Sequence, residues 1–271
     1  MPGPPLPERS GSRNPENGSS RPDPPERTRD RSGEGEPRQP SLQQYGAAAR
    51  TAPVRLVCFG DIHMAFRAIE QLAPALRDAD HAILTGDLTH FGDPPDAFRV
   101  IEAVRRLAVT GNLDMPWVID ALRAEGISLH GEGRRLGDLG VFGCGGSNIT
   151  PMDTPTEFEE DELRAVLERG HAAVAEAPRR LMICHTPPFD TQLDRLVNGR
   201  PVGSPAVRAF LEARRPDLAV VGHIHEGRGA DRVGATLVLN AGALRDGGYV
   251  VVEDGADGPT AELRNFRAAR A

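Results

Sequence analysis

The chain has 271 residues, a formal net charge of −7, and 39% hydrophobic but only 4% aromatic residues. This length is sufficient for one large domain or two small ones with a sizeable core. Its apolar runs are far shorter than the ~18–20 residues of a membrane span, so we expect no membrane partner. A charged start followed by an apolar stretch, typical of secretory signals, is not visible either.

Three widely spaced cysteines, Cys58, Cys144 and Cys184, do not suit a disulfide framework or a thiolate zinc site. They favour a reducing, cytoplasmic location. The acidic balance argues against broad nucleic-acid binding, which requires a field of positive charge. All 32 basic residues are arginine, which indicates a compositional bias and not a dedicated phosphate-binding surface.

Residues 1–52 differ in composition from the rest of the chain. They are rich in Pro, Gly, Ser and alternating charges, and between Pro7 and Ser41 there is no Leu, Ile, Val or Phe. Such a segment cannot bury enough apolar surface to offset the entropy lost on ordering. We therefore predict a disordered tail over 1–52 and a globular domain over 53–271.

From residue 53 onward, short apolar runs alternate with segments of helical periodicity. The first half predicts strands over 54–59, 82–84 and 107–109, and helices over 65–77, 94–106 and 116–126. Strands that alternate with helices are typical of right-handed parallel crossovers in a layered α/β sheet.

The second half contains more β-like segments. It predicts strands over 127–129, 141–142, 181–184, 218–221, 236–239, 249–252 and 261–266, and helices over 159–174 and 205–214. One domain with two half-sheets fits this order best. A small cap over residues 127–158 is the alternative.

Polar clusters follow five of the predicted strands. They are Gly60-Asp61-Ile-His63, Gly86-Asp87-Leu-Thr-His90, Gly111-Asn112-Leu113-Asp114, His185-Thr-Pro-Pro188 and Gly222-His223-Ile-His225. Ligands of open α/β sheets bind beyond the carboxyl ends of the strands, so we expect all five clusters on one rim. Their nitrogen and oxygen donors suit Mn²⁺, Fe²⁺ or Zn²⁺, and a central Asp87 could bridge two cations about 3.5–4 Å apart.

The order of these clusters resembles the signature of the calcineurin-like metallophosphoesterases. The resemblance extends from Val54 to Phe266, and the loops Gly145-Gly-Ser-Asn148 and His185-Thr-Pro-Pro188 are most similar to a small, uncharacterised archaeal and bacterial branch. It implies an α/β fold, a four-layer αββα sandwich, with two divalent metal ions (Mn, Fe, Zn or Ni) at one edge.

The resemblance also implies roles for individual residues. Asp61, His63 and His225 would hold the first ion, Asn112, His185 and His223 the second, and Asp87 would bridge them. A metal-bridging hydroxide would then hydrolyse a small phosphodiester or phosphomonoester. In this interpretation the catalytic residues include Asp87 and Asn112.

One position departs from the family pattern. Many relatives have a histidine where this chain has Leu113, and that histidine contacts the phosphate or protonates the leaving oxygen. Leucine can do neither, so esters with poor leaving groups should be disfavoured. His90, close to Asp87 in the sequence, is the candidate replacement as proton donor. Asp114, which has lost its usual histidine neighbour, receives no role.

Two other classes of function compete with a phosphoesterase. A metal-binding scaffold of the same fold would account for Leu113, although every ligand position is intact. A nuclease would require a basic groove, and the globular part is acidic. A small phosphoester is therefore the expected partner, and the sequence identifies no protein partner.

Overall fold

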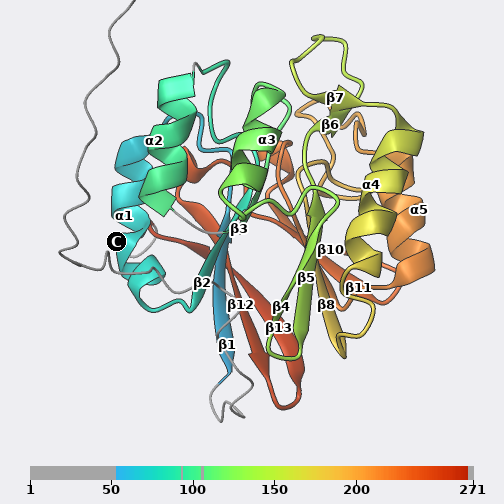
Figure 1. The fold of residues 1–271 in the computed structure, drawn as a ribbon. Helices are drawn as coiled ribbons and strands as arrows, with labels where there is room; N and C mark the ends of the chain where they lie inside the picture. The colour runs from blue at the N-terminus through green and yellow to red at the C-terminus, as the bar shows by residue number, and fades with distance from the viewer. Residues whose placement is uncertain (1–52, 93, 105–106, 268–271) are drawn as a thin grey trace, which may run out of the picture. The chain divides into compact units, whose positions relative to one another are not determined.

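Two β-sheets lie between two groups of helices (Figure 1). The structure is a computed structural model that describes residues 53–92, 94–104 and 107–267. The predicted disordered tail over 1–52 lies outside the described residues, as do Arg105 and Arg106 at the end of the predicted helix over 94–106.

The first sheet has five strands in the order β13-β12-β1-β2-β3. These are β13 (Gly258–Asn265), β12 (Gly248–Gly255), β1 (Val54–Phe59), β2 (His81–Thr85) and β3 (Leu107–Val109). Strands β1, β2 and β3 are parallel, and β12 joins β1 in the antiparallel sense. Helices α1 (Phe66–Arg77), α2 (Pro94–Val104) and α3 (Trp117–Ala124) lie on its outer side (Figure 1).

The second sheet has six strands in the order β10-β11-β9-β8-β5-β4. These are β10 (Gly229–Val233), β11 (Thr236–Asn240), β9 (Leu218–Val221), β8 (Arg179–Cys184), β5 (Leu139–Cys144) and β4 (Gly133–Leu136). Helices α4 (Glu160–Ala172) and α5 (Pro205–Arg214) cover it. Two short strands, β6 (Ser147–Asn148) and β7 (Glu157–Phe158), pair separately.

Three apolar cores lie between the four layers and join them. On β1, Val57 and Phe59 pack with the helices of the first sheet, whereas Leu56 and Cys58 pack between the two sheets. A third core joins the second sheet to α4 and α5 and includes Phe142. Because β1 is buried on both faces, its sequence is nearly continuously apolar and does not alternate. The predicted four-layer αββα sandwich is confirmed.

The segment over 127–129 is not the strand that its sequence predicts. Ser128 forms an isolated bridge with Ala108 of the first sheet, and His130 forms one with Gly143 of the second. The chain crosses here from one sheet to the other, so neither pairing extends into a ladder. Within the alternative cap over 127–158, β4 and β5 belong to the six-stranded sheet, whereas β6 and β7 pair only with each other.

The buried His130 ties this crossing to the glycine-rich turn after β5. The Gly145 amide donates to His130 Nδ1 at 3.1 Å, and the His130 ring lies 5.3 Å from the ring of Phe158. Burial, together with Arg123 and Arg169, lowers the pKa of His130 to about 4. Protonation of His130 would place a charge in a buried position and would remove the acceptor of the Gly145 hydrogen bond.

We expect His130 to make the fold acid-sensitive. Its stabilising effect is complete above the unfolded pKa of about 6.5 and is lost as the pH falls toward 4, on the order of 2–3 kcal/mol. Urea unfolding at several pH values would measure this loss. The His130→Asn variant keeps an acceptor for Gly145 but cannot be protonated, so it should lose less stability over this range. Equal losses in both proteins would contradict the assignment.

Candidate metal centre

The five polar clusters meet at one edge of the sandwich, at the carboxyl ends of β1, β2, β3, β8 and β9. Hydrogen bonds connect them directly. The His223 amide donates to both carboxylate oxygens of Asp61 at 3.2 Å, and the Leu113 amide donates to Asp87 Oδ1 at 2.9 Å. Sequence segments more than 160 residues apart thus supply one site.

Asp61, His63 and His225 form the first group of possible metal ligands. His225 Nε2 lies 3.2 Å from Asp61 Oδ1 and 3.1 Å from His63 Nε2, and His63 Nε2 lies 4.0 Å from Asp61 Oδ1. These three side chains are the ones that the resemblance assigns to the first ion.

Asp61, Asp87 and His185 form the second group, and all three are buried. His185 Nε2 lies 3.5 Å from Asp87 Oδ2 and 3.2 Å from Asn112 Oδ1. The other neighbour of Asp87 Oδ2 is His63 Nε2, at 3.8 Å. Asp87, a member of the second group, therefore also approaches His63 of the first, and Asp61 belongs to both groups.

His223 is placed less directly than the other expected ligands. Its ring centroid lies 5.1 Å from that of His185, but it belongs to neither group of converging ligand atoms. Burial and the neighbouring His185 lower the pKa of His223 to about 4, which keeps its imidazole neutral. A neutral imidazole is the form that binds metals.

The backbone is strained at four of the predicted ligands. Asp61, His63, Asp87 and His223 have positive φ angles of 48°, 46°, 47° and 70°. Residues with side chains rarely adopt this region, and such strain persists only where surrounding contacts enforce it. Here the amides of Asp61 and His63 donate to the carbonyls of Gly86 and Asp87. The strained turns aim all four side chains at the same rim.

Two glycines allow the loops that carry Asp87, Asn112 and His185 to pack against one another. A Cβ on Gly111 would lie 1.9 Å from Asp87 Oδ1, and one on Gly86, where φ is +108°, would lie 2.4 Å from His185 Nδ1. The glycine that precedes each of Asp87 and Asn112 is therefore required by the packing of the site.

His185 is held in an orientation that leaves Nε2 facing Asp87. Its Nδ1 donates to the carbonyl of Thr85 at 2.9 Å, which fixes the ring. Burial alone would lower the pKa of His185, but Asp87 outweighs it and raises that pKa to about 10. Although burial opposes ionisation of Asp87, His185 and His63 lower its pKa to about 2.

Asp114, for which the sequence suggested no role, is a buried organising carboxylate. It accepts hydrogen bonds from the amides of Leu88, Thr89 and Gly111 at 2.8–3.1 Å and from the Thr89 hydroxyl at 2.8 Å. These donors directly follow Asp87 or precede Asn112. Burial and the Asp87 charge raise the pKa of Asp114 to about 6. Most of its donors lie 25 or 26 residues away along the chain, so no local signal reveals them.

His90 lies beside the first ligand group. Its ring centroid is 5.8 Å from that of His63, edge to face, and 5.1 Å from that of Phe91. The side chain is exposed. Leu113, in place of the family histidine, is partly exposed, and its carbonyl accepts from the Phe91 amide at 3.1 Å.

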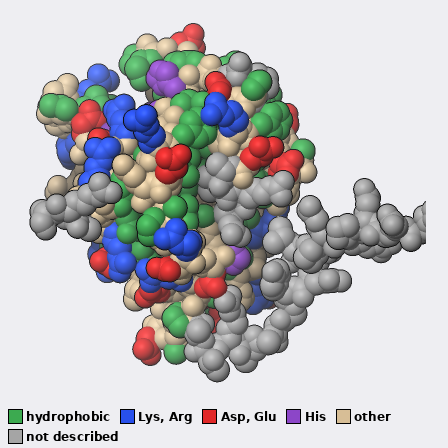
Figure 2. All heavy atoms as spheres, turned by 90° about the vertical axis from the view of Figure 1, so that its left-hand side faces the viewer, with side chains coloured by type: hydrophobic (Ala, Val, Ile, Leu, Met, Phe, Trp, Pro, Cys, Tyr) green, Lys and Arg blue, Asp and Glu red, His purple; other side chains and the backbone are tan. Residues whose placement is uncertain are grey.

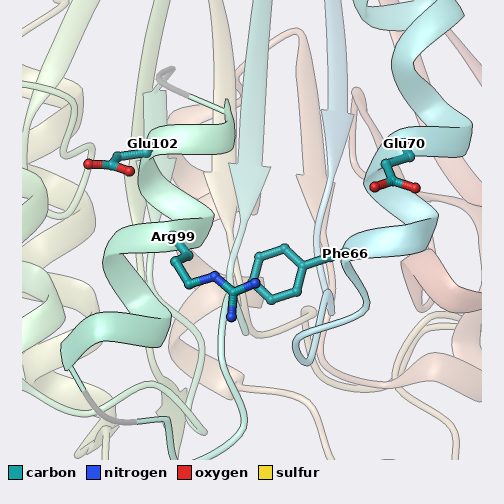
Figure 3. Close-up of a pocket in the computed structure, with 4 residues that line it drawn as sticks. All are labelled: Phe66, Glu70, Arg99 and Glu102. Atoms are coloured by element: carbon teal, nitrogen blue, oxygen red, sulfur yellow. The ribbon is translucent and has the colours of Figure 1, made fainter.

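Away from the candidate metal centre, a hollow of about 440 Å³ lies between α1 and α2 (Figure 3). Phe66, Glu70, Arg99 and Glu102 line it, and the Arg99 guanidinium lies 4.6 Å from the Phe66 ring centroid. None of these four residues belongs to the ligand groups. The hollow offers no converging metal donors.

The donor set fits divalent ions. Two Nε2 atoms and a carboxylate oxygen face one another within about 4 Å in the first group, and a buried carboxylate joins it to the second. Imidazole and carboxylate are the ligands that Mn, Fe and Zn accept, and no thiolate is among them. The fold and this site together define an α/β protein with two groups of Asp and His side chains that could hold divalent metal ions.

Comparison with known proteins identifies the family. The calcineurin-like phosphoesterase family model matches residues 54–227, so the chain belongs to this family. It is 31% identical to the uncharacterized protein MJ1162 of Methanocaldococcus jannaschii over 202 residues, which cover 69% of this chain and 87% of that protein.

Solved structures show the same fold. The protein TT1561 of Thermus thermophilus is 20% identical, with a TM-score of 0.58 over 80% of this chain and all of that one. A putative 5'-nucleotidase from Staphylococcus aureus is 16% identical, with a TM-score of 0.55 over 79% of this chain and 54% of that one. In the part of this chain that the structure describes, no helix combines the length and apolarity needed to cross a bilayer.

Proposed function

We infer that the protein hydrolyses a small phosphodiester or phosphomonoester with the help of two divalent ions. The observation that carries this inference is the buried Asp87, whose Oδ2 lies 3.5 Å from His185 Nε2 and 3.8 Å from His63 Nε2. One carboxylate between two sets of imidazole donors is the arrangement that a two-ion site needs.

The residues of this chain have separate tasks in the reaction. Asp61, His63 and His225 would hold one ion, Asn112, His185 and His223 would complete the other, and Asp87 would serve both. When bound, the ions supply an activated water and neutralise charge on the phosphoryl oxygens. Thr85 fixes the His185 ring, and Asp114 holds the two loops at a constant separation.

Hydrolysis of bis-p-nitrophenyl phosphate tests the proposal directly. Chelator-stripped protein should be inactive, and addition of Mn²⁺ should restore release of nitrophenolate, which leaves without protonation. The same titration with Fe²⁺, Zn²⁺ and Ni²⁺ would identify the preferred ion. Absence of turnover in protein that calorimetry shows to bind these ions would favour the scaffold alternative.

His90 is the proposed proton donor. Its ring is exposed, and the ring centroid lies 5.8 Å from that of His63 in the first ligand group. We expect His90→Ala to slow hydrolysis of phenyl esters about 10²-fold and to leave nitrophenyl esters nearly unaffected, because only phenolate needs protonation. Equal slowing of both ester types would instead indicate a role in binding or folding.

A nuclease remains the less supported function. Figure 2 shows arginine and acidic side chains mixed on the face that carries α1 and α2, so this face has no uniform positive field. A cytoplasmic location also stays a prediction, based on three cysteines that the structure shows to be free and buried.

A further inference from the structure

The segment between β6 and β7 is fastened directly to the metal centre. The Thr156 amide donates to the Asn112 carbonyl at 3.1 Å, and the Thr156 hydroxyl donates to the Asp114 carbonyl at 2.6 Å. Asn112 Nδ2 donates to Thr154 Oγ1 at 2.9 Å. Because its Nδ2 is engaged there, Asn112 directs Oδ1 toward His185.

One carboxylate fixes the conformation of the tip of this segment, Thr150 to Thr154 with the preceding Ile149. Glu157 accepts hydrogen bonds from the amides of Thr150 and Thr154 at 3.0 and 2.9 Å, and from both of their hydroxyls. Although burial opposes it, these hydrogen bonds lower the pKa of Glu157. The tip is therefore preorganised by a carboxylate that remains ionised, and its end is anchored on Asn112.

The preorganised tip presents apolar side chains to solvent. Ile149 is 56% exposed and Met152 is 69% exposed. Phe91, 54% exposed, comes from the loop after Asp87, where its amide donates to the carbonyl of Leu113. These exposed apolar side chains stand on two segments that are each hydrogen-bonded to the loop of Asn112 and Leu113, which indicates apolar contact area for a ligand of the neighbouring site.

We propose that Phe91, Leu113, Ile149 and Met152 select phosphoesters whose organic group is apolar, an alkyl or aryl chain. The inference rests on the proposed hydrolysis of a phosphoester at the adjacent centre. These four side chains offer contact area but no strong hydrogen-bond donor or acceptor, so they would favour a hydrocarbon over a sugar or a base. Leu113, whose amide donates to Asp87 Oδ1 and whose carbonyl accepts from the Phe91 amide, adds a partly exposed apolar side chain at the position of the family histidine.

Two esters with the same leaving group separate selectivity for the apolar group from the rate of the chemical step. We expect Mn²⁺-loaded protein to hydrolyse p-nitrophenyl hexyl phosphate with a kcat/KM at least about tenfold above that of p-nitrophenyl methyl phosphate. Burial of only two methylene groups accounts for about that factor. Calorimetry should likewise show tighter binding of hexylphosphonate than of methylphosphonate, by a similar factor, whether or not turnover occurs.

Three variants test which side chains cause the selectivity for the hexyl ester. Met152→Ser and Ile149→Ser should each reduce the hexyl-to-methyl ratio toward one. Val197→Ser, which removes a side chain that is 88% exposed on another segment, should leave both rates unchanged. Metal-dependent hydrolysis of both esters at equal rates overturns the proposed selectivity alone. Selective hexylphosphonate binding without turnover supports it and overturns the hydrolysis, whereas equal binding without turnover overturns both.

Discussion

Asp87→Asn should reduce Mn²⁺-dependent hydrolysis of bis-p-nitrophenyl phosphate by roughly 10³-fold or more. The substitution keeps the shape of the side chain but removes the negative charge that lies between His185 and His63. Charge stabilisation by bound ions amounts to several kcal/mol of the barrier, and the amide holds those ions poorly. Initial rates at saturating Mn²⁺ measure the effect.

The fold should survive this substitution. Removing the charge of Asp87 relieves its repulsion of the buried Asp114, but it also removes the partner that raises the pKa of His185. Because His185 and His63 lower the pKa of Asp87, its charge stabilises the metal-free fold, and we expect the variant to fold with a moderately lower melting temperature than the wild type. Asp120→Asn, on the exposed side of α3, is the matched control and should retain full activity. Full activity in Asp87→Asn would falsify the two-ion assignment.

Asp114→Ala should destabilise the protein by about 3–5 kcal/mol, because four buried donors lose their acceptor together. Urea unfolding of the metal-free protein measures this loss. The loops that carry Asp87 and Asn112 should also separate, so calorimetry should show weaker Mn²⁺ binding in any variant that remains folded.

Asp114→Asn is the more conservative test of the same residue. Its amide keeps one acceptor oxygen but directs an NH₂ group toward backbone N–H donors, so we expect an intermediate loss of stability. A loss below about 1 kcal/mol in both variants would show that the loops hold their positions without this carboxylate.

Much of the fold follows from local sequence. Apolar runs that are buried on both faces, such as Val54–Phe59, were predicted as strands and are strands. Two of the strands that the sequence did not predict, β4 (Gly133–Leu136) and β10 (Gly229–Val233), are the two edges of the six-stranded sheet, and the other two, β6 and β7, are short strands that pair separately. Edge strands tolerate charged residues such as Arg134 and Asp231, so no apolar pattern marks them.

The candidate ligands were also predictable, since a glycine and a polar residue after each buried strand leave a local pattern. Asp61, His63, Asp87, Asn112, His185 and His225 converge in the structure as expected, and His223 lies beside them. Their order along the chain and their position at strand ends were sufficient, because parallel strands bring their carboxyl ends to one edge.

Only the tertiary structure revealed how the site is supported. Asp114 binds donors 25 residues away, and Asn112 is oriented by Thr154, 42 residues farther along the chain. A buried carboxylate or a loop threonine has the same local appearance whether or not it has such partners. The sequence therefore determined which groups could bind metal, and long-range hydrogen bonds decided where each group points.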